Sequence, residues 1–259
     1  MVDLYSIFVA VAVGLAAGYL GSLMVLEKMA LVGDALSHVA LPGLALGILF
    51  GFNPFFGAFI FLFGSAMIIW YIQRFTKLSF ETLVGATFTL ALAIGILLVP
   101  QPDLLEALFG DVSNISLVET VVAVIVAVLG IALTTLIRKQ IVLGLISEEL
   151  AASYNVNIAM TNLLYLLLVS VIVAIGIRIT GTLLVGFLVV TPAAAAKTVS
   201  SNLARYFSLS ALFGALSAFS GLIVSDYLGL PPGPMVVFSG ISIFIVVLIV
   251  RWITKFSSM

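Results

Sequence analysis

The chain has 259 residues, of which 63% are hydrophobic and only 8% are charged. A soluble domain carries about 25% charged residues and could not bury so much apolar surface. The same hydrophobicity excludes intrinsic disorder, and a net charge of −1 gives no basis for binding nucleic acid. The chain contains no cysteine, which excludes disulfides and thiolate metal sites. This composition is that of a polytopic membrane protein.

A helix that crosses a membrane needs about 20 mostly apolar residues. Nine runs come near this length, and they are continuous rather than alternating as in a membrane β-barrel. The runs are residues 4–26, 30–50, 54–73, 82–100, 117–137, 158–177, 181–196, 206–228 and 234–251. The seventh is the shortest and could merge with its neighbour. We therefore predict an all-α fold with eight or nine transmembrane helices, forming a single transmembrane domain over residues 1–259.

The basic residues predict the orientation of the chain in the membrane. If the spans alternate from an N-terminus outside the cell, nine of the ten basic residues fall on the inner side, and only Arg178 falls outside. Lys and Arg are retained preferentially on the cytoplasmic side. We therefore predict a multi-pass protein of the plasma or inner membrane, with its C-terminus in the cytoplasm.

The second predicted span, residues 30–50, contains an acidic residue within its length, Asp34, whereas the other ten acids lie at span ends or in loops. The only histidine, His38, follows four residues later and therefore shares its helix face. An ionised carboxylate at membrane depth costs at least about 2.5 kcal/mol, so such residues are usually functional. Three interpretations stay open: a structural pair, a proton relay, or a set of metal ligands.

One Asp and one His are too few ligands for a metal site made by a single chain. A two-fold dimer would bring two of each to its axis, giving four nitrogen and oxygen donors. Pro42, four residues after His38, lacks the N–H that would bond the His38 carbonyl, so we expect the helix to kink there. Backbone freed in this way is tolerated where it lines a cavity or is buried in protein.

Two segments carry a resemblance to a known family. The run V-L-E-K-M-A-L-V-G-D-A-L-S-H-V-A-L-P-G, residues 25–43, resembles the signature of ABC-3 family permeases. These are the membrane subunits of ATP-driven importers for zinc, manganese and related divalent ions. The run G-T-L-L-V-G-F-L-V-V-T-P-A-A-A-A, residues 181–196, resembles the family's second marked segment. Chain length, span count and an acidic outer segment before the fifth span agree, so the resemblance covers essentially the whole chain.

The resemblance implies a homodimer that works with two kinds of partner. A metal-binding protein would deliver the ion on the outer face, and two copies of a separate ATPase would act from the cytoplasm. It further implies that Asp34 and His38 form the metal site in the translocation path. The divalent ion would then be the transported substrate, and no permanently bound cofactor is expected.

The inner segment, residues 138–157, is the expected contact with the ATPase. The family usually shows Asp-x-Glu-x-Ala-x-x-x-Gly in a short cytoplasmic helix there, and Glu149 and Ala151 match this pattern. Ser147 stands where Asp is usual, and Ser caps a helix N-terminus about as well. Asn155 stands where Gly is usual, and Asn also suits a left-handed C-terminal position. We therefore predict an ATPase-coupling helix around Glu149 and Ala151.

The chain contains neither a G-x-x-x-x-G-K-[ST] phosphate-binding loop nor a Ser-His-Asp pattern, so we do not expect it to be an enzyme. The predicted function is the permease subunit of an ATP-binding-cassette importer for zinc, manganese or iron. A proton- or ion-coupled secondary transporter, with Asp34–His38 as its protonation site, is the alternative. A membrane enzyme with a single metal ion is a third interpretation, for which further ligands and a base would be needed.

Overall fold

The computed structural model describes residues 3–76, 78–98, 108–110, 112 and 115–256, and in these residues the regular structure is helical throughout. The helices are α1 (Leu4–Leu26), α2 (Ala30–Phe50), α3 (Pro54–Phe75), α4 (Phe80–Leu98), α6 (Leu117–Ile146), α7 (Glu148–Ser153), α8 (Ile158–Val199), α9 (Leu203–Leu228) and α10 (Pro232–Phe256). Most of the acidic outer segment before the fifth predicted span lies outside the described residues.

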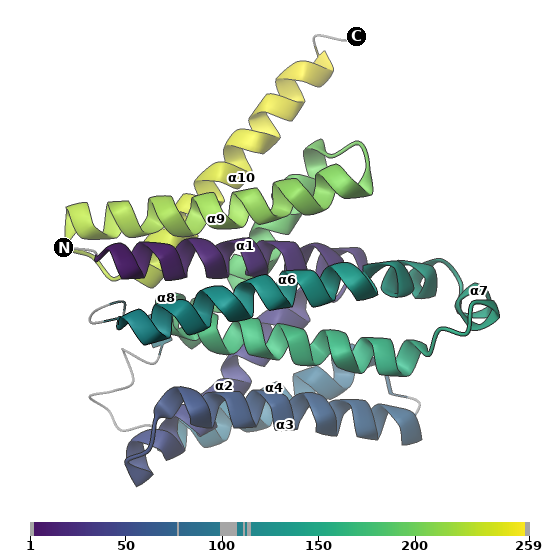
Figure 1. Ribbon diagram of the computed structural model, residues 1–259, viewed down its shortest axis with the longest axis horizontal. Coiled ribbons are helices and arrows are strands. Elements are labelled where there is room, and N and C mark those ends of the chain that lie inside the picture. Colours follow the sequence, from purple (N-terminus) through teal and green to yellow (C-terminus); the bar gives the residue numbers. More distant parts are fainter. Residues whose placement is uncertain (1–2, 77, 99–107, 111, 113–114, 257–259) are drawn as a thin grey trace.

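Within the described residues, eight helical segments are long and apolar enough to cross a membrane. A further apolar segment, Leu184–Val199, is shorter. Figure 1 shows the long helices running side by side as one bundle, with α10 leaving it at an angle. The predicted all-α polytopic fold is therefore confirmed.

The sixth and seventh predicted spans form one element, α8, which is interrupted at Gly181. The backbone there has φ 74° and ψ 172°, a conformation that is essentially restricted to glycine. A Cβ at this position would also clash with the backbone of Leu108 and Gly110, which lie in the connection between α4 and α6. The chain can therefore reverse its direction at Gly181 while helix continues on both sides.

Contacts along α8 show that its two legs run in opposite directions. The Ala159 carbonyl, near the start of α8, accepts a hydrogen bond of 2.8 Å from Trp70 Nε1 at the C-terminal end of α3. Arg178 stacks instead over a ring at the start of α3. Lys197 Nζ donates to the Val25 carbonyl at the end of α1, 3.5 Å away. With this return leg added to the eight long helical segments, the described residues cross the bundle nine times. The two ends of the described chain accordingly lie at opposite ends of the bundle (Figure 1).

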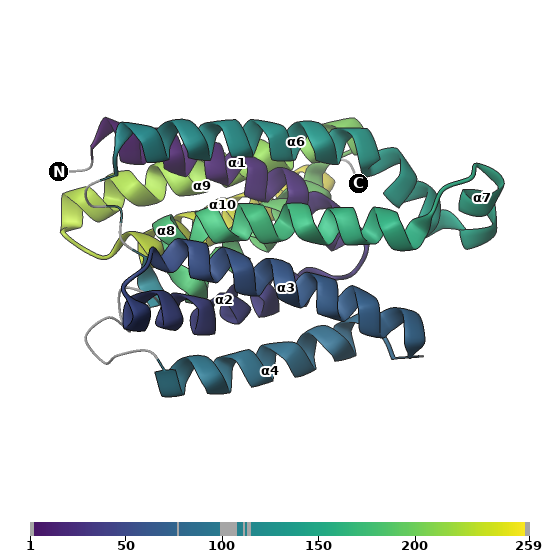
Figure 2. The ribbon, with the colours of Figure 1, turned by 60° about the horizontal axis from the view of Figure 1, so that its bottom comes forward.

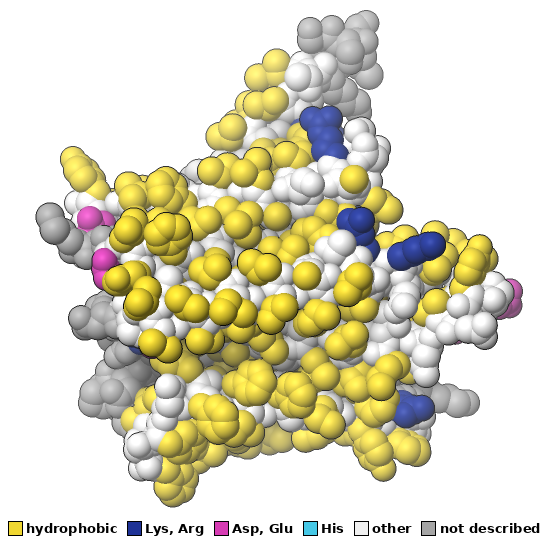
Figure 3. All heavy atoms as spheres, in the orientation of Figure 1, with side chains coloured by type: hydrophobic (Ala, Val, Ile, Leu, Met, Phe, Trp, Pro, Cys, Tyr) yellow, Lys and Arg dark blue, Asp and Glu magenta, His cyan; other side chains and the backbone are white. Residues whose placement is uncertain are grey.

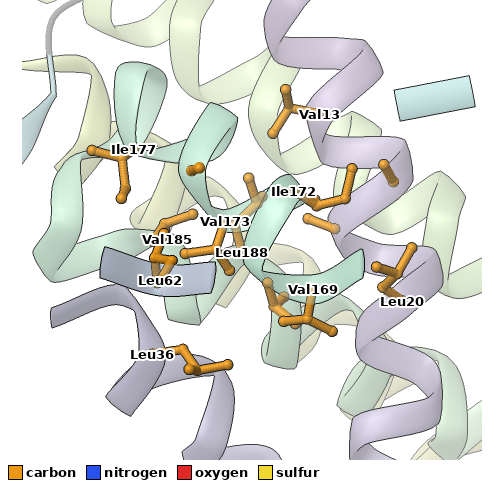
Figure 4. Packing of buried hydrophobic residues seen from close by; sticks show 14 of the residues in the cluster. Val13, Leu20, Leu36, Leu62, Val169, Ile172, Val173, Ile177, Val185 and Leu188 are labelled. Atoms are coloured by element: carbon orange, nitrogen blue, oxygen red, sulfur yellow. The ribbon is translucent and has the colours of Figure 1, made fainter. Parts of the chain in front are cut away.

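The two legs of α8 form the centre of the packing. Figure 4 shows side chains from both legs gathered around Leu62 of α3, and Leu36 of α2 belongs to the same buried cluster. In lipid, helices associate through close van der Waals packing rather than by escaping water, which favours small residues at their contacts. Gly14 of α1 illustrates this, since a Cβ added there would lie 2.5 Å from the Gly214 carbonyl oxygen of α9.

Charge separates along the bundle axis. The middle of the face in Figure 3 is mainly hydrophobic and shows no charged side chain. Basic side chains gather toward the end that carries α7, and acidic ones appear at the opposite end and on α7 itself. This distribution is that of a bundle whose sides face lipid and whose two ends face water.

Candidate metal site and coupling helix

Asp34 and His38 lie one turn apart in the first half of α2, which packs against α3, α4 and α8. Their side chains differ in accessibility. Asp34 is exposed, whereas His38 is buried, with 7% of its surface accessible. The helical spacing that the sequence predicts is therefore observed, with the carboxylate at the surface of the chain and the imidazole behind it.

The His38 ring is held by α4. It packs against Phe88, with ring centroids 5.2 Å apart and an interplanar angle of 56°. The Nδ1 atom of His38 is buried and has no hydrogen-bond partner among the described residues. A buried polar atom without a partner costs about 1–3 kcal/mol and indicates an unfilled role. Asp34 and His38 therefore do not satisfy each other through this nitrogen, as a purely structural pair would.

The backbone of Asp34 is held by α8. The ideal Cβ position of Gly186 lies only 2.9 Å from Asp34 N and 3.0 Å from Asp34 Cβ, so a side chain there would meet the α2 main chain. Ser37 Oγ donates to the Asp34 carbonyl over 2.5 Å. An exposed carboxylate on a membrane-spanning helix is costly unless water, an ion or another chain faces it.

No group of three or more His, Asp or Glu side chains close enough to hold a metal ion occurs in the described part of the chain. One chain thus presents two side-chain donors, one nitrogen and one oxygen, which is fewer than a closed protein site requires. The same shortage follows from the sequence, and it leaves room for ligands from a second copy.

Pro42 lies inside α2 and is buried. Gly95 of α4 approaches it closely, since a Cβ at Gly95 would lie 2.6 Å from Leu41 Cβ and 3.4 Å from Pro42 N. The proline face of α2 is therefore covered by protein, as expected for backbone that lacks its helical partner. The kink at Pro42 stays a prediction.

The predicted inner helix forms as α7, and its two ends are closed as the sequence indicates. Ser147 Oγ accepts a hydrogen bond of 3.2 Å from the backbone N–H of Leu150. Asn155 takes the left-handed conformation, with φ 54°, and its N–H donates to the Ala152 carbonyl over 2.9 Å. Both substitutions in the family pattern thus preserve the helix.

The two coupling residues predicted in α7 face different ways. Glu149 is exposed and so are its neighbours Leu150 and Tyr154, which gives the helix an accessible outer surface. Ala151 is 0% exposed and faces the rest of the chain. A docking partner can therefore contact Glu149, whereas Ala151 is not accessible to one.

Sequence reasoning assigned no role to Glu27, the C-cap residue of α1. The structure places it in a pocket of about 160 Å³ beside α7, with the polar side chains of Gln140, Glu148, Thr161 and Asn162. Burial raises the pKa of the Glu27 carboxyl to about 7. This carboxyl can thus change its protonation near neutral pH, next to the helix expected to receive the ATPase.

Phe88 and Gly186 were also missed as neighbours of the site. Gly186 lies within the second family segment, where it is one small residue among many. Phe88 carries no local signal, because its contact with His38 joins residues 50 positions apart. Only packing between helices identifies either residue.

The chain is similar to known transport proteins over nearly its full length. The model of the ABC 3 transport family matches residues 4–251. The manganese transport system membrane protein MntC of Listeria innocua is 30% identical over 93% of this chain and 88% of its own length. The high-affinity zinc uptake system membrane protein ZnuB of Buchnera aphidicola is 27% identical over 86% of this chain and 87% of its own. The solved structure of PsaBC from Streptococcus pneumoniae in complex with Fab covers 93% of this chain and 89% of that chain, with 29% identity and a TM-score of 0.82.

Proposed function

The chain belongs to the ABC 3 transport family, and on this premise we propose that it is the membrane permease subunit of an importer for a divalent transition-metal ion. Relatives over nearly the full length are named as manganese or zinc transport proteins. A permease is a transport component, so the energy of ATP has to enter through another polypeptide.

The observation that carries the choice of cargo is the pairing of Asp34 and His38. The exposed Asp34 carboxylate supplies negative charge, which offsets the cost of removing water from the ion. The imidazole of His38 supplies a nitrogen donor on the same helix face. One chain therefore offers two donors of the kinds that divalent first-row ions accept, and the remaining ligands have to come from elsewhere.

The ligand chemistry sets the class of ion. Carboxylate oxygen and imidazole nitrogen serve zinc, manganese and iron alike, and cellular availability often decides between them. The relatives carry both manganese and zinc in their names. The proposal is therefore for divalent first-row ions as a class.

Assembly and orientation complete the proposal. A second copy would bring its own Asp34 and His38 to a shared axis, supplying the ligands that one chain lacks. The ATPase would dock on α7 through the surface around Glu149, at the end of the bundle where basic residues gather. That end would be cytoplasmic, and the N-terminus would lie on the outer side of the membrane. A metal-binding protein would deliver the ion to the outer side.

The test is uptake of radioactive manganese or zinc into proteoliposomes that contain the chain, its ATPase and its metal-binding protein. We expect uptake that requires ATP and all three proteins. An imposed pH gradient without ATP should drive none. Uptake that follows the pH gradient alone would contradict the proposal and identify a secondary transporter.

A further inference from the structure

A groove with a volume of about 370 Å³ lies between α3 and α6, at the end of the bundle opposite α7. The first leg of α8 runs between these two helices and forms its floor, as Figures 1 and 2 both show. The side chains along α3 and α6 beside it are accessible, with Phe56 61% and Val122 51% exposed. The groove therefore opens on the side of the bundle that faces lipid.

The lining of the groove changes from polar to apolar along the helix axes. Asn53, which caps α3 by accepting from the Phe55 N–H over 2.9 Å, lies at one end with Glu119 and Arg178. Phe59 and Val126 line the groove six and seven residues further along α3 and α6. Six helical residues span about 9 Å, so the polar mouth and the apolar interior are well separated. A phospholipid has the same order of headgroup and acyl chain.

The mouth carries one charge of each sign. Arg178 is the one basic residue that sequence analysis assigns to this side of the membrane, and its guanidinium stacks 5.3 Å above the Phe55 ring. Glu119 lines the same end of the groove, and one of its carboxylate oxygens, Oε2, accepts from the Ser116 N–H over 2.7 Å at the start of α6. A guanidinium matches a phosphate group, and a carboxylate matches an amine. A headgroup that holds both a phosphate and an amine complements this pair.

We propose that the groove binds one aminophospholipid of the surrounding leaflet. One acyl chain lies on α8 between Phe59 and Val126, the phosphate meets Arg178, and the amine meets Glu119. The lipid fills the gap between two helices that each pack on α8, and it thereby joins α3 to α6.

The experiment counts phospholipids that remain bound to the protein in detergent, by native mass spectrometry. Ala123 is buried in the groove, so Ala123→Phe fills the space of the acyl chain. Ala132→Phe adds the same volume to an exposed position of α6 outside the groove and serves as the control. The wild type and Ala132→Phe should retain one phospholipid per chain, and Ala123→Phe should retain none. Arg178→Gln should weaken binding about tenfold, as loss of a charge-assisted contact does.

Competition between phosphatidylethanolamine and phosphatidylglycerol tests the headgroup, and the former should be bound preferentially. Equal retention of phospholipid by Ala123→Phe and Ala132→Phe would overturn the proposal, and so would preference for phosphatidylglycerol. Loss of dimer with unchanged lipid in Ala123→Phe would also overturn it and identify the groove as an interface between copies. If Ala123→Phe fails to fold, Val126→Trp replaces it, because Val126 is partly buried and a tryptophan there also fills the groove. The number of phospholipids bound per chain then tests the proposal in the same way.

Discussion

Gly186 in the return leg of α8 lies directly against the backbone of Asp34 in α2. Its ideal Cβ position is nearest to Asp34 Cα and lies 2.9 Å from Asp34 N, distances that real Cβ atoms essentially never show. The atoms in the way belong largely to main chain and so cannot move cheaply. The position of the carboxylate therefore depends on the absence of a side chain at Gly186.

Gly186→Ala should slow metal uptake by roughly tenfold, because displacing a group that supports a ligand weakens a metal site by about this factor. Gly64→Ala in α3 is the matched control, since nothing lies within 4 Å of a Cβ at that position. Uptake per folded molecule in proteoliposomes measures both. Equal rates for the two variants would show that Gly186 does not position the site.

Ala151→Arg should uncouple ATP hydrolysis from transport. Ala151 is the fully buried residue of α7. Burying an unpaired guanidinium costs several kcal/mol, so the arginine side chain should displace α7 while the transmembrane bundle stays intact. Ala204→Arg, at an exposed position near the start of α9, makes the same change without burial. We expect several-fold less metal transported per ATP hydrolysed for Ala151→Arg alone. Normal transport by that variant, reconstituted with its partners, would place the coupling contact elsewhere.

Glu27 should make stability decrease as pH rises from about 4.5 to about 7. Burial raises its pKa from an ordinary 4.5 to about 7, so the folded chain holds a proton over a range where the unfolded chain has lost it. The free energy of unfolding should therefore fall between about pH 4.5 and 7, by no more than about 3.4 kcal/mol. Glu27→Gln should remove this slope and raise the melting temperature near pH 8.

Melting curves in detergent from pH 5 to 8 measure this effect. Glu148→Gln is the control, because it neutralises an exposed carboxylate of the same pocket. If the melting temperature of Glu27→Gln depends on pH as steeply as that of the wild type, Glu27 is not the source of the pH dependence.

The sequence predicted well what depends on neighbouring residues. Apolar run length marked the spans, and Ser147 and Asn155 closed α7 through contacts of a few residues. Contacts between residues far apart in the chain could not be predicted from the sequence. The reversal at Gly181 depends on a loop about 70 residues earlier, and the inward direction of Ala151 depends on how α7 meets the bundle.

The candidate site shows the same division. Helical spacing predicted that Asp34 and His38 share a face. Their unequal exposure and the unpartnered Nδ1 of His38 come from α4 and α8, which the sequence does not place beside α2. Nothing local could therefore distinguish a self-satisfied pair from two open donors.

Two copies of α2 should approach each other at a shared axis. The chain has no cysteine of its own, so single cysteines report their positions without interference. Ala35→Cys, partly exposed beside Asp34, should form a covalent dimer under mild oxidation. Ala40→Cys, at a position with 0% exposure, should not. If no position from 30 to 45 cross-links to its own copy, the shared-site geometry fails.

Uptake by the Asp34→Asn, His38→Ala double variant tests the central claim most directly. Asn keeps the shape of the Asp side chain and removes its charge, and Ala suits a helix already rich in small residues. The measurement is ATP-dependent uptake of radioactive manganese or zinc per folded molecule, with the partner proteins present. The account predicts a folded, membrane-inserted protein whose uptake is at background. Metal uptake at the wild-type rate by that folded double variant would contradict it.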